Sequence, residues 1–233
     1  MKQVVTGFTQ KFADSIYATA FALIGLALRL WHLSQPKGFI FDEVYYAQNA
    51  HSLAQHGVEL TSKGLADFIV HPPVGKWIIA LGIKAFGFNE FGWRVSSAII
   101  GSLSIALIYF VAKKLFANPL ISSSAAILTL SDGLHLVHSR TALLDIFLMF
   151  FTLLAFFFLL NSRHWLAGIS LGLAAGVKWS GLYFSLLTSP LFSTPISVSI
   201  KRWKRLTHCN ELSNLDCSSV RPNMESCPSS PTS

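Results

Sequence analysis

Residues 16–33 read IYATAFALIGLALRLWHL, an almost entirely apolar stretch. A bilayer core of about 30 Å needs about 20 residues of helix, so this stretch predicts a membrane span. Lys2 and Lys11 precede the stretch, and Trp31 and His32 close it, as expected at a membrane interface. No small-residue cleavage site follows it, so we expect a retained span and not a removed signal peptide.

The rest of the chain has the same apolar character. Hydrophobic residues make up 52% of it and charged residues 12%, and the mean hydropathy is +0.51. We therefore predict an all-α integral membrane protein, a multi-pass bundle of transmembrane helices. The net charge of +7 could suggest nucleic acid, but the basic residues are scattered between the apolar runs, so we predict no nucleic-acid partner.

Further apolar runs predict a total of about five to six spans. These runs cover residues 93–116, 119–137, 142–160, 165–177 and 181–200. Pro190 and Pro195 weaken the last of them. Residues 34–74 are polar, and residues 76–88 form a run too short to cross, which favours a helix lying at the interface.

The basic residues predict the orientation of the chain. They fall at the N-terminus and at Lys113, Lys114, Arg163 and residues 201–205. All of these sites are cytoplasmic if the N-terminus is, in agreement with the positive-inside rule. Residues 1–15 are then a cytoplasmic N-terminus, and residues 34–92 form an outer loop with juxtamembrane helices.

A polar tail of residues 201–233 follows the membrane domain of residues 16–200. It holds all three cysteines, Cys209, Cys217 and Cys227. An odd, irregularly spaced set of thiols is not a disulfide framework, and we predict a disordered tail.

Unusual polar residues gather on the outer side of the predicted bundle. Asp42, Glu43 and His71 lie in the outer loop, and the outer ends of the spans carry Arg29, Arg94, Arg140, Asp145 and Lys178. Charged side chains in such places normally face a bundle interior or a wet cavity. Such a cavity suits an anionic ligand with a lipid tail, and phosphate is the obvious anion for arginine forks and a lysine point charge.

Four motifs then resemble a known family. They are Phe41-Asp-Glu-Val-Tyr-Tyr46, His71-Pro-Pro-Val-Gly-Lys76, Ser139-Arg-Thr-Ala-Leu-Leu-Asp145 and Gly176-Val-Lys-Trp179. In this order they resemble the protein O-mannosyltransferases, above all the bacterial, actinobacterial-type members. The resemblance runs from about Ile16 to about Phe184, covers only the N-terminal half of such proteins, and implies a GT-C fold.

The resemblance implies an inverting transfer of mannose from a polyprenyl or dolichyl phosphate mannose donor to Ser or Thr hydroxyls of translocated proteins. A hydroxyl needs a base to take its proton, and a phosphate leaving group needs cations. Asp42 matches the catalytic aspartate of the family, which makes it the predicted general base, and Glu43 would position the acceptor or the sugar. Arg29, Arg140 and Lys178 would surround the donor phosphate, His71 and Arg94 would shape the acceptor side, and Asp145 would lie deeper in the same cavity.

The resemblance also implies partners and a location. The partners are the membrane lipid donor and secreted or membrane acceptor proteins, with a protein translocation channel as a further candidate, and the location is the plasma membrane of a prokaryote. No bound cofactor is expected. His135 and His138 lie three residues apart without a third ligand, so we predict no metal site there, and the sequence leaves open whether a divalent ion assists.

Simpler interpretations stay open at several positions. Asp42 and Glu43 could be a solvated turn, His71 and the prolines after it could be only a rigid start for a helix, and Arg140 could pair structurally with Asp145. Arg29 and Lys178 could reach the outer interface as long basic side chains do. At the level of function, the alternatives are a GT-C relative that glycosylates a lipid or a cell-wall glycan, a transporter or scaffold subunit, and a truncated, non-catalytic fragment.

Overall fold

The computed structural model describes residues 2–60, 64–66 and 70–193, and the regular secondary structure in this part of the chain is helical apart from one isolated bridge between Leu60 and Ala66. The predicted tail, its cysteines and the end of the predicted sixth span lie outside the described residues. The helices are α1 (Lys2–Leu30), α2 (Glu43–His56), α3 (Val74–Phe86), α4 (Glu90–Phe116), α5 (Pro119–Ser131), α6 (Gly133–His138), α7 (Asp145–Leu160), α8 (His164–Val177) and α9 (Gly181–Ser193).

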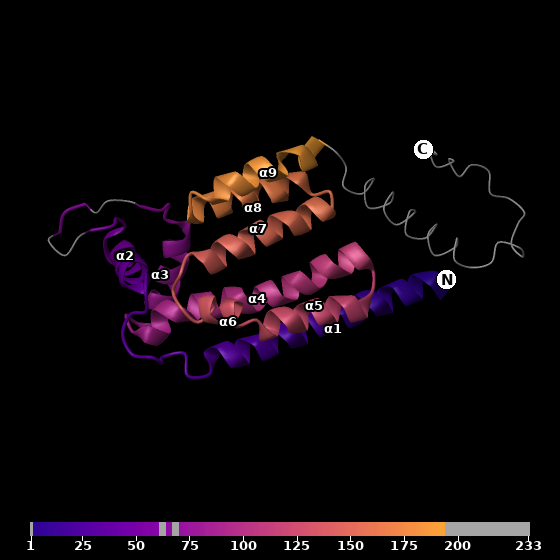
Figure 1. The fold of residues 1–233 in the computed structure, drawn as a ribbon, viewed down its shortest axis with the longest axis horizontal. Coiled ribbons are helices and arrows are strands. Elements are labelled where there is room, and N and C mark those ends of the chain that lie inside the picture. The colour runs from indigo at the N-terminus through magenta and orange to yellow at the C-terminus, as the bar shows by residue number, and fades with distance from the viewer. Residues whose placement is uncertain (1, 61–63, 67–69, 194–233) are drawn as a thin grey trace, which may run out of the picture. The chain divides into compact units, whose positions relative to one another are not determined.

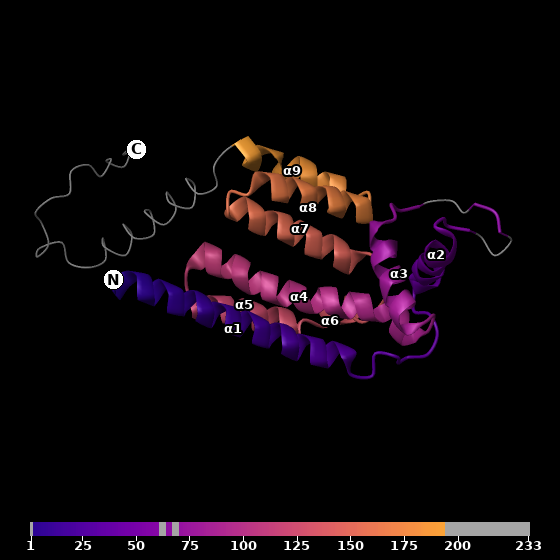
Figure 2. The ribbon, with the colours of Figure 1, turned by 180° about the vertical axis from the view of Figure 1, so that it is seen from behind.

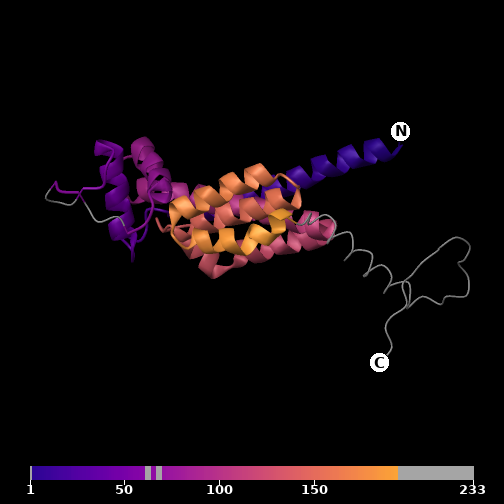
Figure 3. The ribbon, with the colours of Figure 1, turned by 90° about the horizontal axis from the view of Figure 1, so that it is seen from above.

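The long helices run side by side as a bundle, with α4 at its centre (Figure 1). Helix α4 packs against α1, α3, α5 and α7, while α7 packs on α8 and α8 on α9. The same layering is visible from behind (Figure 2). Helices α2 and α3 pack on each other at one end of the bundle and lie across its long axis (Figure 3).

Capping residues explain where the central helices begin and end. Asn89 precedes α4, and its side chain accepts a hydrogen bond from the N–H of Gly92. Helix α4 ends at Ala117 in the left-handed conformation, and Asn118 then caps α5 while Pro119 fills its first turn. Asparagine and proline favour helix starts, so the starts of α4 and α5 follow directly from the sequence, whereas Ala117 adopts a conformation that glycine would favour.

In the described part of the chain, two helices are long and apolar enough to cross a membrane, namely the part of α1 from Phe12 to Leu30 and the whole of α4. Helices α5, α7 and α8 are apolar but shorter. The prediction of one continuous helix over residues 119–137 is wrong. The chain breaks at Asp132, whose carboxylate accepts a hydrogen bond of 2.6 Å from the N–H of His135 and so starts α6 as a separate helix.

The predicted helix over residues 76–88 is confirmed as α3, which begins two residues earlier at Val74. Its outward face carries Trp77, Leu81 and Lys84. An apolar face with an aromatic and a lysine is the composition of helices that lie on a membrane surface. The main hydrophobic core lies directly behind this helix and joins α2, α3, α4, α7 and α8.

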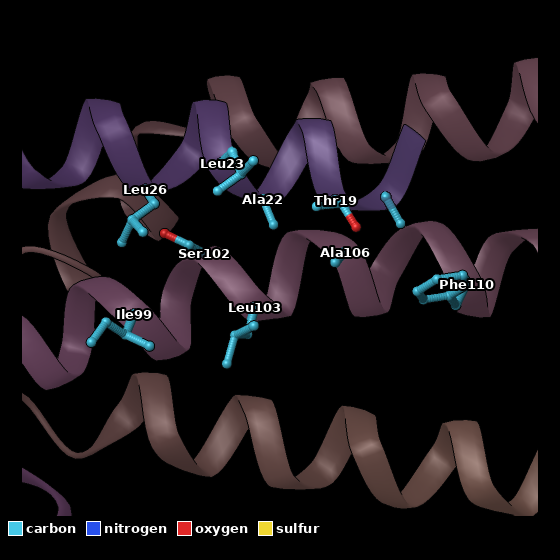
Figure 4. Close-up of a pocket in the computed structure, with 10 residues that line it drawn as sticks. Thr19, Ala22, Leu23, Leu26, Ile99, Ser102, Leu103, Ala106 and Phe110 are labelled. Carbon is cyan, nitrogen blue, oxygen red and sulfur yellow. The ribbon is translucent and has the colours of Figure 1, made fainter. Parts of the chain in front are cut away.

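An apolar groove of about 250 Å³ runs between α1 and α4 (Figure 4). Its polar groups are the hydroxyls of Thr19 and Ser102, and the Ser102 hydroxyl already donates to the carbonyl of Ala98 at 2.7 Å. None of the predicted site residues lines it. The groove therefore offers no chemistry, whereas polar side chains gather at the α2–α3 end of the bundle.

Close packing between α4 and the segment after α6 gives a testable prediction. A Cβ added at Gly101 would overlap the side chain of Ser139, whereas a Cβ at Gly168 in α8 would meet no atom within 4 Å. We expect Gly101→Ala to lower the free energy of unfolding by about 1–3 kcal/mol, and Gly168→Ala to be neutral or slightly stabilising. Thermal unfolding of both variants in detergent tests this expectation, and equal midpoints would contradict it.

Candidate active site

A buried ion pair between Glu43 and Arg94 forms the base of the site. Arg94 Nε donates to Glu43 Oε1 at 2.9 Å and Arg94 Nη2 to Glu43 Oε2 at 2.8 Å. Both side chains are fully buried. Two backbone groups complete the carboxylate shell, since the N–H of Ile40 donates to Oε2 at 2.9 Å and that of Ala142 to Oε1 at 2.8 Å. The acceptor capacity of Glu43 is therefore filled by the protein itself.

Arg94 also holds the segment that connects α1 to α2. Its Nη1 donates to the carbonyls of Leu33 and Pro36 at 3.2 and 2.9 Å, and its Nη2 donates to the carbonyl of Gly38 at 2.8 Å. Together with the two bonds to Glu43, these use all five N–H donors of the guanidinium. One side chain from α4 thus fixes the path of the chain up to the start of α2.

Asp42 is the neighbour of Glu43, yet its environment is different. It occupies the N-cap position of α2 without a side-chain capping bond, and it is partly exposed. Within the described residues, no hydrogen bond or ion pair engages its carboxylate. A free carboxylate beside a rigid buried anchor is the arrangement that a general base requires.

A second ion pair stands near Asp42. Lys178, at the end of α8, donates from Nζ to Asp145 Oδ1 at the start of α7, at 2.9 Å, and both side chains keep contact with solvent. The next residue, Trp179, donates from its indole N–H to the carbonyl of Val70 at 2.9 Å. This bond ties the end of α8 to the loop that carries His71.

His71 and Tyr46 join these groups into one cluster. Their rings lie 6.2 Å apart between centroids. Burial and, after it, the ammonium group of Lys178 lower the pKa of His71, whereas the carboxylates of Asp145 and Asp42 act in the opposite direction. Burial raises the pKa of Tyr46 to about 12, and the charges of Asp42 and Asp145 add to the rise. Both carboxylates thus act on both rings, so the four side chains and Lys178 share one electrostatic neighbourhood.

His71 offers this cluster a free polar atom. Its Nδ1 is buried and has no hydrogen-bond partner among the residues that the structure describes. Because its pKa is lowered, the imidazole is neutral at neutral pH and can accept or donate one hydrogen bond at that nitrogen. We interpret His71 as a group available to a bound substrate, beyond its part in starting α3.

A buried pair that the sequence analysis missed joins the start of α3 to the segment after α2. Lys76, in the first turn of α3, donates to Glu59 Oε2 at 2.6 Å, and Asn49 of α2 donates to the same oxygen at 2.9 Å. Lys76 is 1% exposed and Glu59 6% exposed. Nothing in the local sequence around Glu59 signals this role, because the pairing joins residues that only the fold brings together.

Arg29 lies elsewhere than predicted. Its side chain is fully buried between α1, α4 and α6, its Nη2 lies 2.7 Å from His135 Nδ1, and its Nη1 donates to the carbonyl of Gly25 at 3.1 Å. His135 Nε2 is in turn 2.8 Å from the hydroxyl of Ser104. The alternative that Arg29 reaches the outer interface is wrong, since it has no exposed surface. Its placement also does not support a direct contact with a donor phosphate.

Arg140 caps the end of α1 and does not pair with Asp145. Its guanidinium donates to the carbonyls of Leu28 and His32, both at 3.1 Å. Cations favour the C-terminal end of a helix, so this contact stabilises the end of α1. The structural pair proposed as an alternative for Arg140 and Asp145 is wrong, because the partner of Asp145 is Lys178.

The structure therefore sorts the predicted site residues into three groups. Asp42, His71, Asp145 and Lys178 share one electrostatic neighbourhood, in which Asp145 and Lys178 form an ion pair. Glu43 and Arg94 lie buried behind it, which favours a positioning role over the direct contact with acceptor or sugar that the sequence predicted. Arg29 lies buried between α1, α4 and α6, and Arg140 caps the end of α1.

Solved structures of membrane transferases share this fold. The structure of the S. cerevisiae protein O-mannosyltransferase Pmt1-Pmt2 complex bound to the sugar donor matches with a TM-score of 0.65 at 24% identity, over 82% of this chain and 30% of that one. ArnT from Cupriavidus metallidurans in the apo state matches with a TM-score of 0.64 at 17% identity, over 91% of this chain and 45% of that one. The all-helical architecture is thus similar to that of GT-C membrane transferases.

The sequence gives a more specific assignment. Residues 19–211 match the dolichyl-phosphate-mannose-protein mannosyltransferase family, and the chain belongs to this family. The match reaches beyond Phe184, where the motif-based resemblance ended.

Curated relatives agree with the family. The polyprenol-phosphate-mannose–protein mannosyltransferase of Mycobacterium tuberculosis is 37% identical over 199 residues, which cover 72% of this chain and 38% of that protein. The enzyme of the same name from Mycolicibacterium smegmatis is 36% identical over 208 residues, covering 76% and 40%. Protein O-mannosyl-transferase 1 of Rattus norvegicus is 31% identical over 200 residues, covering 72% and 26%. The chain thus spans about two fifths or less of the length of these relatives.

Proposed function

We propose that this chain transfers mannose from a polyprenyl or dolichyl phosphate mannose donor to Ser or Thr hydroxyls of an acceptor protein, with inversion at the anomeric carbon. One observation carries the proposal. Of two adjacent carboxylates, Glu43 is buried and saturated by four hydrogen bonds, whereas Asp42 is unengaged within the described residues and, like Lys178, acts electrostatically on His71. This arrangement provides one available base beside one cation.

Each group then has a chemical role. The acceptor oxygen forms its bond to the anomeric carbon while the bond from that carbon to the phosphate oxygen breaks. The hydroxyl proton passes to Asp42, and the lipid phosphate leaves with the bonding electrons. Lys178 stabilises the charge on the departing phosphate. His71 donates or accepts one hydrogen bond at the acceptor side.

The same proposal sets the topology. The bundle crosses the plasma membrane in about five to six spans, the N-terminus is cytoplasmic, and α2 and α3 lie outside, where lipid-linked donor and translocated acceptor meet. Labelling with a membrane-impermeant reagent at single cysteines placed in residues 34–60 checks the topology. Labelling of these cysteines from the cytoplasmic side alone would contradict the proposed topology.

A transfer assay tests the function. Membranes that contain the chain are given radiolabelled polyprenyl phosphate mannose and a Ser/Thr-rich peptide, and label is expected on the peptide. Label on a lipid product would instead favour a GT-C transferase for lipids or cell-wall glycans. Absence of any transfer would indicate a fragment that carries the family motifs without their activity.

A further inference from the structure

The exposed face of α2 begins with two large aromatic side chains beside Asp42. Phe41 is 79% exposed and Tyr45 is 66% exposed. Tyr46, the next residue, packs its ring near His71 and is partly buried, so the two adjacent tyrosines lie on different sides of the helix. Aromatic side chains that are left this open beside a candidate base point to a ligand.

The turn that carries Phe41 is built to hold it outward. Phe41 has φ 50°, in the left-handed region that bulky residues rarely adopt. The N–H of Glu43 donates to the carbonyl of Ile40 at 3.0 Å, and the N–H of Ile40 donates to the Glu43 carboxylate at 2.9 Å. The buried Glu43 thus closes a tight turn on both sides of Phe41. Strained residues held in place by their surroundings cluster at ligand-binding positions.

The rest of this face is polar but uncharged. Gln48 and Gln55 follow Tyr45 along the exposed side of α2, and no Lys or Arg occurs anywhere in the helix. Within the described residues, neither glutamine amide takes part in a hydrogen bond. Aromatic side chains with free amides suit a polypeptide, since the rings contact side chains and the amides bond to the backbone.

A membrane surface is the less favoured occupant. Helices that lie on lipid combine an apolar face with Lys or Arg, a composition that α3 has with Trp77, Leu81 and Lys84. Helix α2 lacks it, and it lies beyond α3, at the end of the molecule (Figures 1 and 3). The two helices therefore divide the outer end into a lipid-type face and a peptide-type face.

We propose that Phe41, Tyr45 and Gln48 form an acceptor ledge, which binds an extended, uncharged segment of the acceptor polypeptide beside its Ser or Thr. Residues three or four apart on a helix are about 5–6 Å apart, close to the roughly 6.6 Å that separates alternate residues of an extended chain. Alternate acceptor side chains can therefore meet Tyr45 and Gln48 while the hydroxyl lies near Asp42. The role of this ledge in catalysis depends on the proposed function.

Peptide binding tests the ledge without requiring transfer. A fluorescent, uncharged Ser/Thr peptide with apolar residues is titrated against the chain in nanodiscs without donor. We expect the double variant Phe41→Ala with Tyr45→Ala to weaken peptide binding at least about tenfold, the effect typical of aromatic anchors. The single variant Tyr45→Phe, which keeps the ring, should retain most of the binding. Trp165→Ala is the matched control, because Trp165 is 69% exposed at the start of α8, and it should change nothing.

The outcomes separate the two proposals. Aromatic-dependent peptide binding supports the ledge even if no mannose is transferred. No binding by the unaltered chain, or equal binding by the double variant, would overturn it. In a background without the native cysteines, Tyr45→Cys in vesicles should react with an impermeant maleimide. Protection by lipid would assign this face to the membrane and also overturn the proposal.

Discussion

Arg94→Met is expected to destabilise the fold strongly. The substitution removes the cation that pairs with the buried Glu43 carboxylate and leaves this carboxylate with only its two backbone N–H donors. It also removes the hydrogen-bond donor of the carbonyls of Leu33, Pro36 and Gly38. Breaking a buried ion pair by removing one partner destabilises proteins by about 3–5 kcal/mol. Typical total stabilities are about 5–15 kcal/mol, so this loss is a large part of the whole.

The matched control is Lys37→Met, which also removes a cation from an ion pair. Lys37 lies 3.7 Å from Glu90, and its side chain is 66% exposed. Exposed pairs contribute about 0–1 kcal/mol, and we expect almost no change. Thermal unfolding in detergent compares the two variants, and an Arg94→Met midpoint as high as that of Lys37→Met would refute the anchor role.

A second variant shows what the anchor does for the site. Glu43→Gln replaces one carboxylate oxygen with an NH₂ group, which would face either Ile40 or Ala142 and one nitrogen of Arg94, all of them donors. The turn before α2 should loosen, and Asp42 with it. We interpret the Glu43–Arg94 pair as the element that gives Asp42 its fixed position, which is why the two acidic neighbours have different roles.

The sequence predicts the arrangement of this molecule better than the orientation of its side chains. Apolar runs and caps such as Asn89 and Asn118 locate the helices because they act locally. The break at Asp132 had a local signal too, an acidic residue followed by glycine inside an apolar run. Those parts of the fold could be predicted because their cause lies within a few residues.

Side-chain direction depends on the rotation of each helix about its axis, which sequence spacing alone does not set. Each residue turns a helix by about 100°, so Asp42 and Glu43 at the start of α2 face different surroundings. Arg29 turns toward His135 because of how α1 sits on α4. Glu59 and Lys76 meet only through the packing of α2 on α3. The sequence motifs contain most residues of the cluster around His71, whereas the fold determines which of their side chains remain without a protein partner among the described residues.

Asp42→Asn is expected to reduce mannose transfer by about 10²–10⁴-fold, the usual contribution of general acid–base catalysis. Asparagine has the shape of aspartate and is equally good at an N-cap position, so the fold and the affinity for donor and acceptor should persist. The loss should fall on kcat and on kcat/KM alike, which marks an interaction made only in the transition state.

The control for Asp42→Asn is another aspartate-to-asparagine change at a helix N-cap. Asp132 caps α6 through the N–H of His135, a bond that asparagine can also accept, and it lies outside the cluster around His71. Asp132→Asn should therefore transfer mannose at the original rate. Asp42→Glu keeps the base but moves it by one methylene, and its rate should lie between the two. If Asp42→Asn transferred mannose as fast as Asp132→Asn, the proton of the acceptor would have to leave by another route. Asp145 would then be the next carboxylate to test, because it shares the cluster and releases its lysine once the donor phosphate competes for that cation.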